Sequence, residues 1–166
     1  MTPFRARMQS AAVSVIFAFA VTSAALAAPE EQRRLTPADI AAMAKGGAGA
    51  GTSGVSGIQT TVLSGDPTAP GPYTIALRVP AHTRIAAHTH RDDRAAVVVS
   101  GTWFFGYGSS ADETALRALE PGSFYTEPAD APHFAMTRDE PATVYITGFG
   151  PTDTHYIDAA TDPRRP

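Results

Sequence analysis

From residue 58 onward, the chain is built of short segments in which apolar and polar side chains alternate, separated by turns. Apolar residues fill every second position from Tyr73 to Val79, and Pro80 ends this run. Such a period of two is typical of a half-buried strand. The 166 residues include 14 glycines and 14 prolines, which favour short strands and turns over long helices. The pattern predicts an all-β sandwich or barrel.

Further strands are expected at regular spacing along the rest of this region. Ser100-Gly101 has the composition of a tight turn, so we expect residues 95–99 and 102–105 to pair as a hairpin. Pro121-Gly122 marks a second turn. The other expected strands are 84–90, 116–119, 123–127, 133–137 and 142–149, the last with Val144 and Ile146 on one side.

Residues 1–27 have the features of a secretory signal peptide. Arg5 and Arg7 precede an apolar run over residues 11–21 that is short for a bilayer span, and Ala25-Leu26-Ala27 is a small-x-small cleavage signal. The alternative is an uncleaved membrane anchor. Cleavage would give a periplasmic or secreted protein with no membrane attachment.

Residues 28–57 are expected to form a helical extension and a linker. Thr36 can cap a helix that begins with Pro37, carries Asp39 in its first turn and ends near Lys45. Residues 46–57 are rich in glycine, alanine and serine and are typical of a flexible linker. They lack the Gly-Lys-Ser/Thr ending of a phosphate-binding loop. The expected barrel covers 58–157, and the polar tail 158–166 is expected to be disordered.

Charge and cysteine content exclude several classes of protein. The formal net charge of -3 argues against a nucleic-acid partner, which would require a basic face. The absence of cysteine excludes disulfides, thiolate ligands and a cysteine nucleophile.

His88-Thr89-His90 is the most informative short motif. Residues two apart on a strand point to the same side, so both imidazoles can share a metal ion. A lone His-x-His is more often a pair of surface or hydrogen-bonded residues, so the flanking sequence decides its meaning.

With those flanks, the chain resembles the cupin superfamily. The first cupin motif runs Gly, five residues, His-x-His, three or four residues, Glu, six residues, Gly. Arg94 and Gly101 stand at its last two marked places. The second motif runs Gly, five residues, Pro-x-Gly, two residues, His, three residues, Asn. Its marked places hold Gly122, Pro128, Asp130, His133 and Thr137.

The resemblance implies a cupin-type double-stranded jelly-roll barrel in which His88, His90 and His133 converge on one divalent transition metal ion. Imidazoles suit Fe, Zn, Mn, Ni and Cu, and the sequence does not separate them. His82 and Asp130 replace two motif glycines, and both are turn positions. The motif's glutamate ligand is replaced by Arg94, and arginine offers only donors. The fourth ligand is therefore undefined, unless Glu127, Asp92 or Asp93 turns inward.

The neighbours of this site each have two interpretations. Arg94 either pairs with Asp92 or Asp93 at the surface or faces the pocket, beside Glu127 or an anionic substrate. Glu127 is either an outer partner that orients a ligand imidazole or an exposed strand end. Aromatic residues are expected in the core or barrel wall, and some could line a substrate pocket: Trp103, Phe104, Phe105, Tyr107, Phe124 and Tyr125. His82 and His155 are expected at the surface.

Two functions follow from these residues. One is a metal-dependent enzyme, dioxygenase-like, acting on a small organic molecule, because three neutral ligands leave coordination positions open. The other is a non-catalytic periplasmic cupin that binds or senses a small anion. Exposed edge strands also leave a homodimer open.

Export can be tested by intact mass. The secreted protein is expected to begin at Ala28, because cleavage follows Ala27. Loss of Arg5 and Arg7 would lower the formal charge from -3 to -5. Soluble periplasmic protein that still begins at Met1 would contradict the signal peptide.

Overall fold

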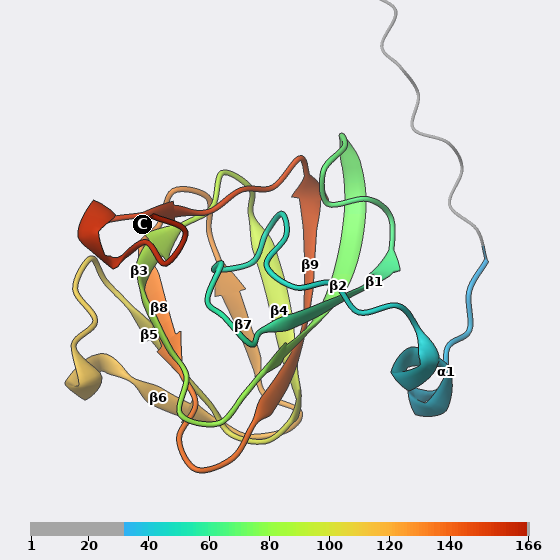
Figure 1. Cartoon of the computed structure of the whole chain (residues 1–166), viewed down its shortest axis with the longest axis horizontal. Coiled ribbons are helices and arrows are strands. Elements are labelled where there is room, and N and C mark those ends of the chain that lie inside the picture. Colours follow the sequence, from blue (N-terminus) through green and yellow to red (C-terminus); the bar gives the residue numbers. More distant parts are fainter. Residues whose placement is uncertain (1–31, 166) are drawn as a thin grey trace, which may run out of the picture.

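The computed structural model describes residues 32–165, which form two antiparallel sheets facing each other (Figure 1). This confirms the predicted all-β jelly-roll class. The first sheet has the order β1-β2-β9-β4-β7 and the second β10-β3-β8-β5-β6. The strands are β1 (Gln59–Ser64), β2 (Gly71–Val79), β3 (Arg84–Thr89), β4 (Arg94–Ser100), β5 (Trp103–Tyr107), β6 (Arg117–Leu119), β7 (Phe124–Glu127), β8 (His133–Met136), β9 (Ala142–Gly150) and β10 (His155–Tyr156).

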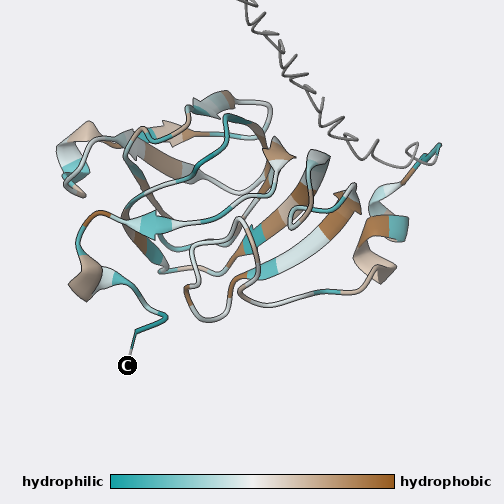
Figure 2. Cartoon of the chain, turned by 90° about the horizontal axis from the view of Figure 1, so that it is seen from above, coloured by the Kyte–Doolittle hydropathy of each residue, from teal (hydrophilic) through white to brown (hydrophobic). Residues whose placement is uncertain are grey.

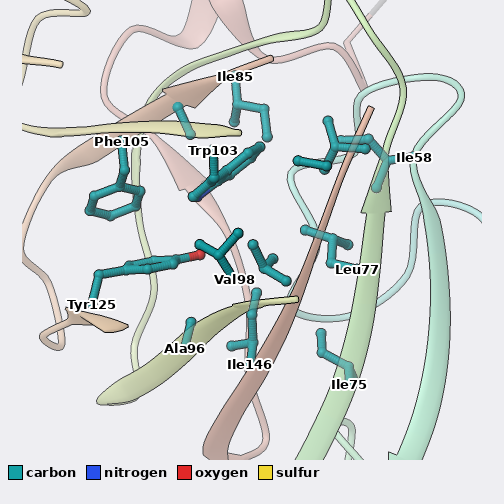
Figure 3. Packing of buried hydrophobic residues seen from close by; sticks show 14 of the residues in the cluster. Ile58, Ile75, Leu77, Ile85, Ala96, Val98, Trp103, Phe105, Tyr125 and Ile146 are labelled. Carbon is teal, nitrogen blue, oxygen red and sulfur yellow. The ribbon is translucent and has the colours of Figure 1, made fainter. Parts of the chain in front are cut away.

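The core lies between the sheets and is filled by alternate side chains of each strand. Val144 and Ile146 are both buried on the inner side of β9, as predicted. Figure 3 shows Trp103 of the second sheet within the same cluster as Leu77 and Tyr125 of the first sheet. The six aromatic residues lie on the barrel strands β5 and β7, as expected for core or barrel wall, and they follow the same alternation in burial. Trp103, Phe105 and Tyr125 are buried, Phe104 is half-buried, and Tyr107 and Phe124 are exposed.

The predicted hairpin between residues 95–99 and 102–105 is wrong. β4 pairs with β7 and β9, whereas β5 pairs with β6 and β8, so the chain crosses between sheets at Ser100-Gly101. Gly101 has a φ of +70°, and a Cβ there would lie 2.1 Å from the carbonyl oxygen of Pro141. A turn motif indicates where the chain bends. Which strands then pair depends on how the apolar faces of the strands are buried together.

Helix α1 (Pro37–Ala42) begins where the sequence predicts and ends three residues before Lys45. Thr36 and Asp39 form a capping box at its start. Figure 2 shows the helix beside the barrel with hydrophilic and hydrophobic residues mixed along it, and none of its residues is buried. Because no residue of α1 is buried, tertiary packing does not stabilise further turns beyond Ala42. No helix of the described part is long and apolar enough to cross a membrane.

The described parts of both segments, residues 46–57 and 158–165, make hydrogen bonds to the barrel, so neither is the flexible linker or disordered tail that was predicted. In the predicted linker 46–57, Gly46 bridges to Thr60, and the following residues Thr52 and Ser53 are buried. The predicted disordered tail 158–166 contains a 3-10 turn, η2 (Ala159–Thr161), followed by Arg164, whose guanidinium donates to the Thr154 carbonyl oxygen. Hydrogen bonds to distant backbone, which composition does not reveal, hold both segments in place. The signal peptide expected over 1–27 lies outside the described residues.

The sheet crossing gives a stability prediction. Gly101→Ala should lower the free energy of unfolding by more than the ~1–2 kcal/mol of a left-handed alanine, because its Cβ also meets backbone. Gly122→Ala is the matched control, since Gly122 has a φ of +89° and nothing within 4 Å of an added Cβ. Urea denaturation would measure both, and equal losses would contradict the crowding at Gly101.

Candidate metal centre

The three histidines singled out in the sequence come together inside the barrel. His88 lies on β3, His90 follows the end of that strand, and His133 begins β8. His88 and His133 are direct partners in the β3–β8 register. One ligand nitrogen of each histidine lies within 4.8 Å of the others, and all three residues are buried. Strand pairing therefore makes one cluster from residues far apart in the sequence.

The hydrogen bonds of the rings fix which nitrogen faces the cluster. Each Nδ1 lies at hydrogen-bond distance from a backbone carbonyl oxygen, and a carbonyl can only accept, so Nδ1 carries the hydrogen. Each Nε2 of a neutral ring then bears a lone pair. Such outer partners orient metal-binding imidazoles. The acceptors for His88, His90 and His133 are the carbonyl oxygens of Ala86, Asp153 and Ala131 respectively.

Burial keeps these imidazoles neutral. It lowers the pKa of His88 to about 3 and also lowers the pKa of His90 and His133. The Nε2 atoms of His90 and His133 are buried and have no hydrogen-bond partner within residues 32–165. Buried polar atoms are almost always satisfied. Neutral, converging and unsatisfied nitrogens are what a bound metal ion requires, so the residues present fit such an ion.

Arg94 faces the barrel interior and pairs with Glu127. The two residues are direct partners in the β4–β7 register and are 4% and 3% exposed. Arg94 Nε donates to Glu127 Oε2 at 2.6 Å, and Nη2 donates to the same oxygen. Although burial opposes ionisation of Glu127, the Arg94 charge holds the pKa of the carboxyl below its ordinary value. The pair is therefore fully charged inside the barrel.

The surface pairing of Arg94 with Asp92 or Asp93 is wrong. Asp92 is buried but accepts hydrogen bonds from the hydroxyls of Tyr73 and Thr152. Asp93 is exposed and accepts from the backbone N–H of Ala129. Neither carboxylate belongs to the histidine cluster.

Glu127 also approaches the histidines. Its Oε2 lies 3.8 Å from His90 Nε2 and 3.7 Å from His133 Nε2. Its interpretation as an exposed strand end is therefore wrong, because side chains alternate and Glu127 falls on the inward face of β7.

A cavity of about 20 Å³ lies at this cluster, enough for roughly one water molecule. Trp103, Phe105 and Tyr125 form part of its wall. The Tyr125 hydroxyl and the Trp103 indole nitrogen are buried and make no hydrogen bond of ordinary geometry to other described residues. Burial raises the pKa of Tyr125 well above its usual value, so its hydroxyl stays protonated and can donate.

Residues Gly51 to Ser53 lie over the cluster, although the sequence predicted a linker here. The Gly51 carbonyl oxygen accepts from Arg94 Nη1 at 2.8 Å, and Ser53 accepts from the Tyr156 hydroxyl at 2.6 Å through its backbone carbonyl. Gly51 and Ser53 both line the cavity. The small residues of this segment allow its backbone to approach the cluster closely, and this was the feature that could have indicated its role. The same composition is also typical of a flexible linker.

The two substituted motif glycines keep a glycine-like backbone. Among the described residues other than glycine, only His82 and Asp130 have a positive φ, at 55° and 57°. The turns therefore have the conformation that glycine favours, although the side chains differ. His82 and His155 are exposed, as expected.

Comparisons of the whole structure give the same architecture. The polyketide cyclase RemF from Streptomyces resistomycificus matches with a TM-score of 0.61 and 16% identity, over 80% of this chain and 90% of that one. An RmlC-like cupin from Shewanella frigidimarina matches with a TM-score of 0.53 and 12% identity, over 72% and 92%. A cupin 2 conserved barrel domain protein from Rhodopseudomonas palustris matches with a TM-score of 0.51 and 12% identity, over 63% and 69%.

These similarities concern the fold, because every identity is low. The chain spans 65% of a sugar phosphate isomerase from Silicibacter pomeroyi and 47% of the DMSP lyase DddQ from Ruegeria pomeroyi, both at 20% identity and a TM-score of 0.48. No protein-family model matches the sequence, and no curated protein matches it either. The fold inferred from the two motifs is confirmed.

Metal content can be measured directly. His88→Ala, His90→Ala and His133→Ala should each lower Zn²⁺ or Co²⁺ affinity by more than the ~10–100-fold typical of outer partners, because each removes a ligand. His155→Ala is the control, since that side chain is 72% exposed. Chelator competition on protein shown to be folded by circular dichroism would give the affinities. Unchanged affinity in all three variants would mean that the cluster is not the metal site.

Proposed function

We propose that this chain, whose fold is that of the cupin superfamily, binds one divalent transition metal ion through His88, His90 and His133 and is a metal-dependent enzyme. We further propose that the reaction is dioxygenase-like and that the substrate is a small organic molecule. The proposal rests on one observation above all. Three buried imidazoles converge with their lone pairs inward and leave two Nε2 atoms without a hydrogen-bond partner among residues 32–165.

The residues around the cluster support chemistry more than a purely structural role. When bound, the ion supplies Lewis acidity and, if it is redox-active, electron transfer. Tyr125 offers a protonated hydroxyl and Trp103 an indole N–H, both lining the same cavity. These donors can orient an oxygen atom of a small molecule. The apolar wall beside them, including Phe105, excludes bulk water.

The small cavity limits what the site can admit as the structure stands. The cavity of about 20 Å³ holds little more than one water molecule. We propose that a substrate enters by displacement of residues 51–53, which would break the hydrogen bond between Arg94 and the Gly51 carbonyl oxygen. An anionic substrate could then accept a hydrogen bond from the freed Nη1 of Arg94, while Nε and Nη2 still donate to Glu127.

The small cavity also favours the alternative of a non-catalytic protein that binds or senses a small ligand. In that case the cover closes over the ion and no turnover follows. The polyketide cyclase among the similar structures is named as an enzyme, but fold alone does not carry an activity across. The periplasmic or secreted location is proposed from the features of residues 1–27 alone.

Oxygen uptake would separate the two functions. Protein loaded with Fe²⁺, Mn²⁺, Ni²⁺, Cu²⁺ or Zn²⁺ is mixed under air with small chelating molecules, including thiol carboxylates and diketones. We expect uptake with at least one redox-active metal, at a rate that falls at least about 100-fold in His133→Ala, because the metal is lost. His155→Ala should match the unaltered protein. Ligand binding without uptake for any metal would favour the non-catalytic alternative.

A further inference from the structure

Glu127 has two neighbours of opposite character. On one side the Arg94 guanidinium donates twice to its Oε2. On the other side the same oxygen lies 3.8 Å from His90 Nε2 and 3.7 Å from His133 Nε2. Pairing with Arg94 alone does not require Glu127 to lie this close to two imidazole nitrogens.

The approach of Glu127 Oε2 to the two Nε2 atoms is unfavourable unless a cation lies between them. Both Nε2 atoms carry lone pairs, because each ring donates its Nδ1 hydrogen to a backbone carbonyl oxygen. The carboxylate oxygen is an acceptor as well. Three electron-rich atoms thus converge with no hydrogen between them, in a buried region where such repulsion is strong.

The separations are those of atoms that share a metal ion. Ligand bonds of roughly 2.0–2.1 Å in a tetrahedral site place neighbouring ligand atoms about 3.4 Å apart. The observed 3.7 Å and 3.8 Å are close to this value. Small side-chain adjustments on binding would bring the three atoms to bonding distance.

Strand register explains how position 127 can serve. Arg94 and Glu127 are direct cross-strand partners, both on the inward face of their sheet. The Cβ atoms of such partners lie about 4.5–5.5 Å apart, so side chains from either position reach the same point. A carboxylate can thus come from β7 when β4 carries an arginine.

We infer that Glu127 is the fourth protein ligand of the metal ion, supplied from β7 across the strand pair from Arg94. This rests on the proposed function, because it adds a ligand to the same three histidines. Arg94 donates to the same oxygen, so it lowers the electron density that this oxygen can give to the ion. The positive charge of Arg94 is in turn balanced by Glu127.

A pair of variants isolates the carboxylate. Glu127→Gln alone would leave Arg94 buried without its partner, which is costly. Arg94→Met and the double variant Arg94→Met/Glu127→Gln both lack the guanidinium and differ only in a carboxylate against an amide. Chelator competition with Co²⁺ and Zn²⁺ gives their affinities, and visible absorption of the Co²⁺ form reports the ligand set.

We expect Arg94→Met to bind both ions at least as tightly as the unaltered protein, and the double variant to bind at least about tenfold more weakly than Arg94→Met, with an altered Co²⁺ spectrum. Equal affinities and spectra in the two variants would overturn the inference. If these variants misfold, infrared difference spectra of the unaltered protein before and after Zn²⁺ binding decide. Carboxylate bands are expected, and their absence would overturn the inference.

Failure of the proposed function gives a different result. If the three histidine variants bind Zn²⁺ and Co²⁺ as the unaltered protein does, the metal site itself is wrong. If they lose the ions while the double variant keeps them, only the role of Glu127 is wrong.

Discussion

The buried ion pair between Arg94 and Glu127 is the constraint on which the arrangement of the barrel interior depends. Removing either partner leaves a charge inside the barrel, which is far more costly than removing both. The pair joins β4 to β7, and Arg94 also holds the Gly51 carbonyl oxygen of the covering segment. Glu127 faces His90 and His133 at less than 4 Å. One ionic interaction thus connects the first sheet, the cover and the histidine cluster.

The two sheets contribute different chemistry to the same point. The second sheet brings His88 and His133 together as register partners, with neutral rings oriented by backbone carbonyls. The first sheet brings the charged pair. Because these side chains are buried, each keeps its protonation state and orientation, which is the condition for a preorganised site.

The fold and the activity are separate conclusions. The similar structures share the barrel while carrying different names, among them a polyketide cyclase and an RmlC-like cupin. Activity on such a scaffold is decided by the residues at its centre and by access to them. In this chain the centre holds an arginine opposite a glutamate, and Gly51 and Ser53 line the cavity.

The sequence by itself determined the features that are encoded locally. Alternation within single segments predicted the strands, Thr36 and Pro37 predicted the helix start, and His88-x-His90 predicted two rings on one side of a strand. Only the tertiary structure decided which distant segments meet. Arg94 and Glu127 lie 33 residues apart, the turn at Gly101 joins two sheets instead of a hairpin, and residues 51–53 close the site through backbone hydrogen bonds. Periodicity fixes where a side chain points relative to its own strand, whereas pairing and register depend on how all apolar faces are buried together.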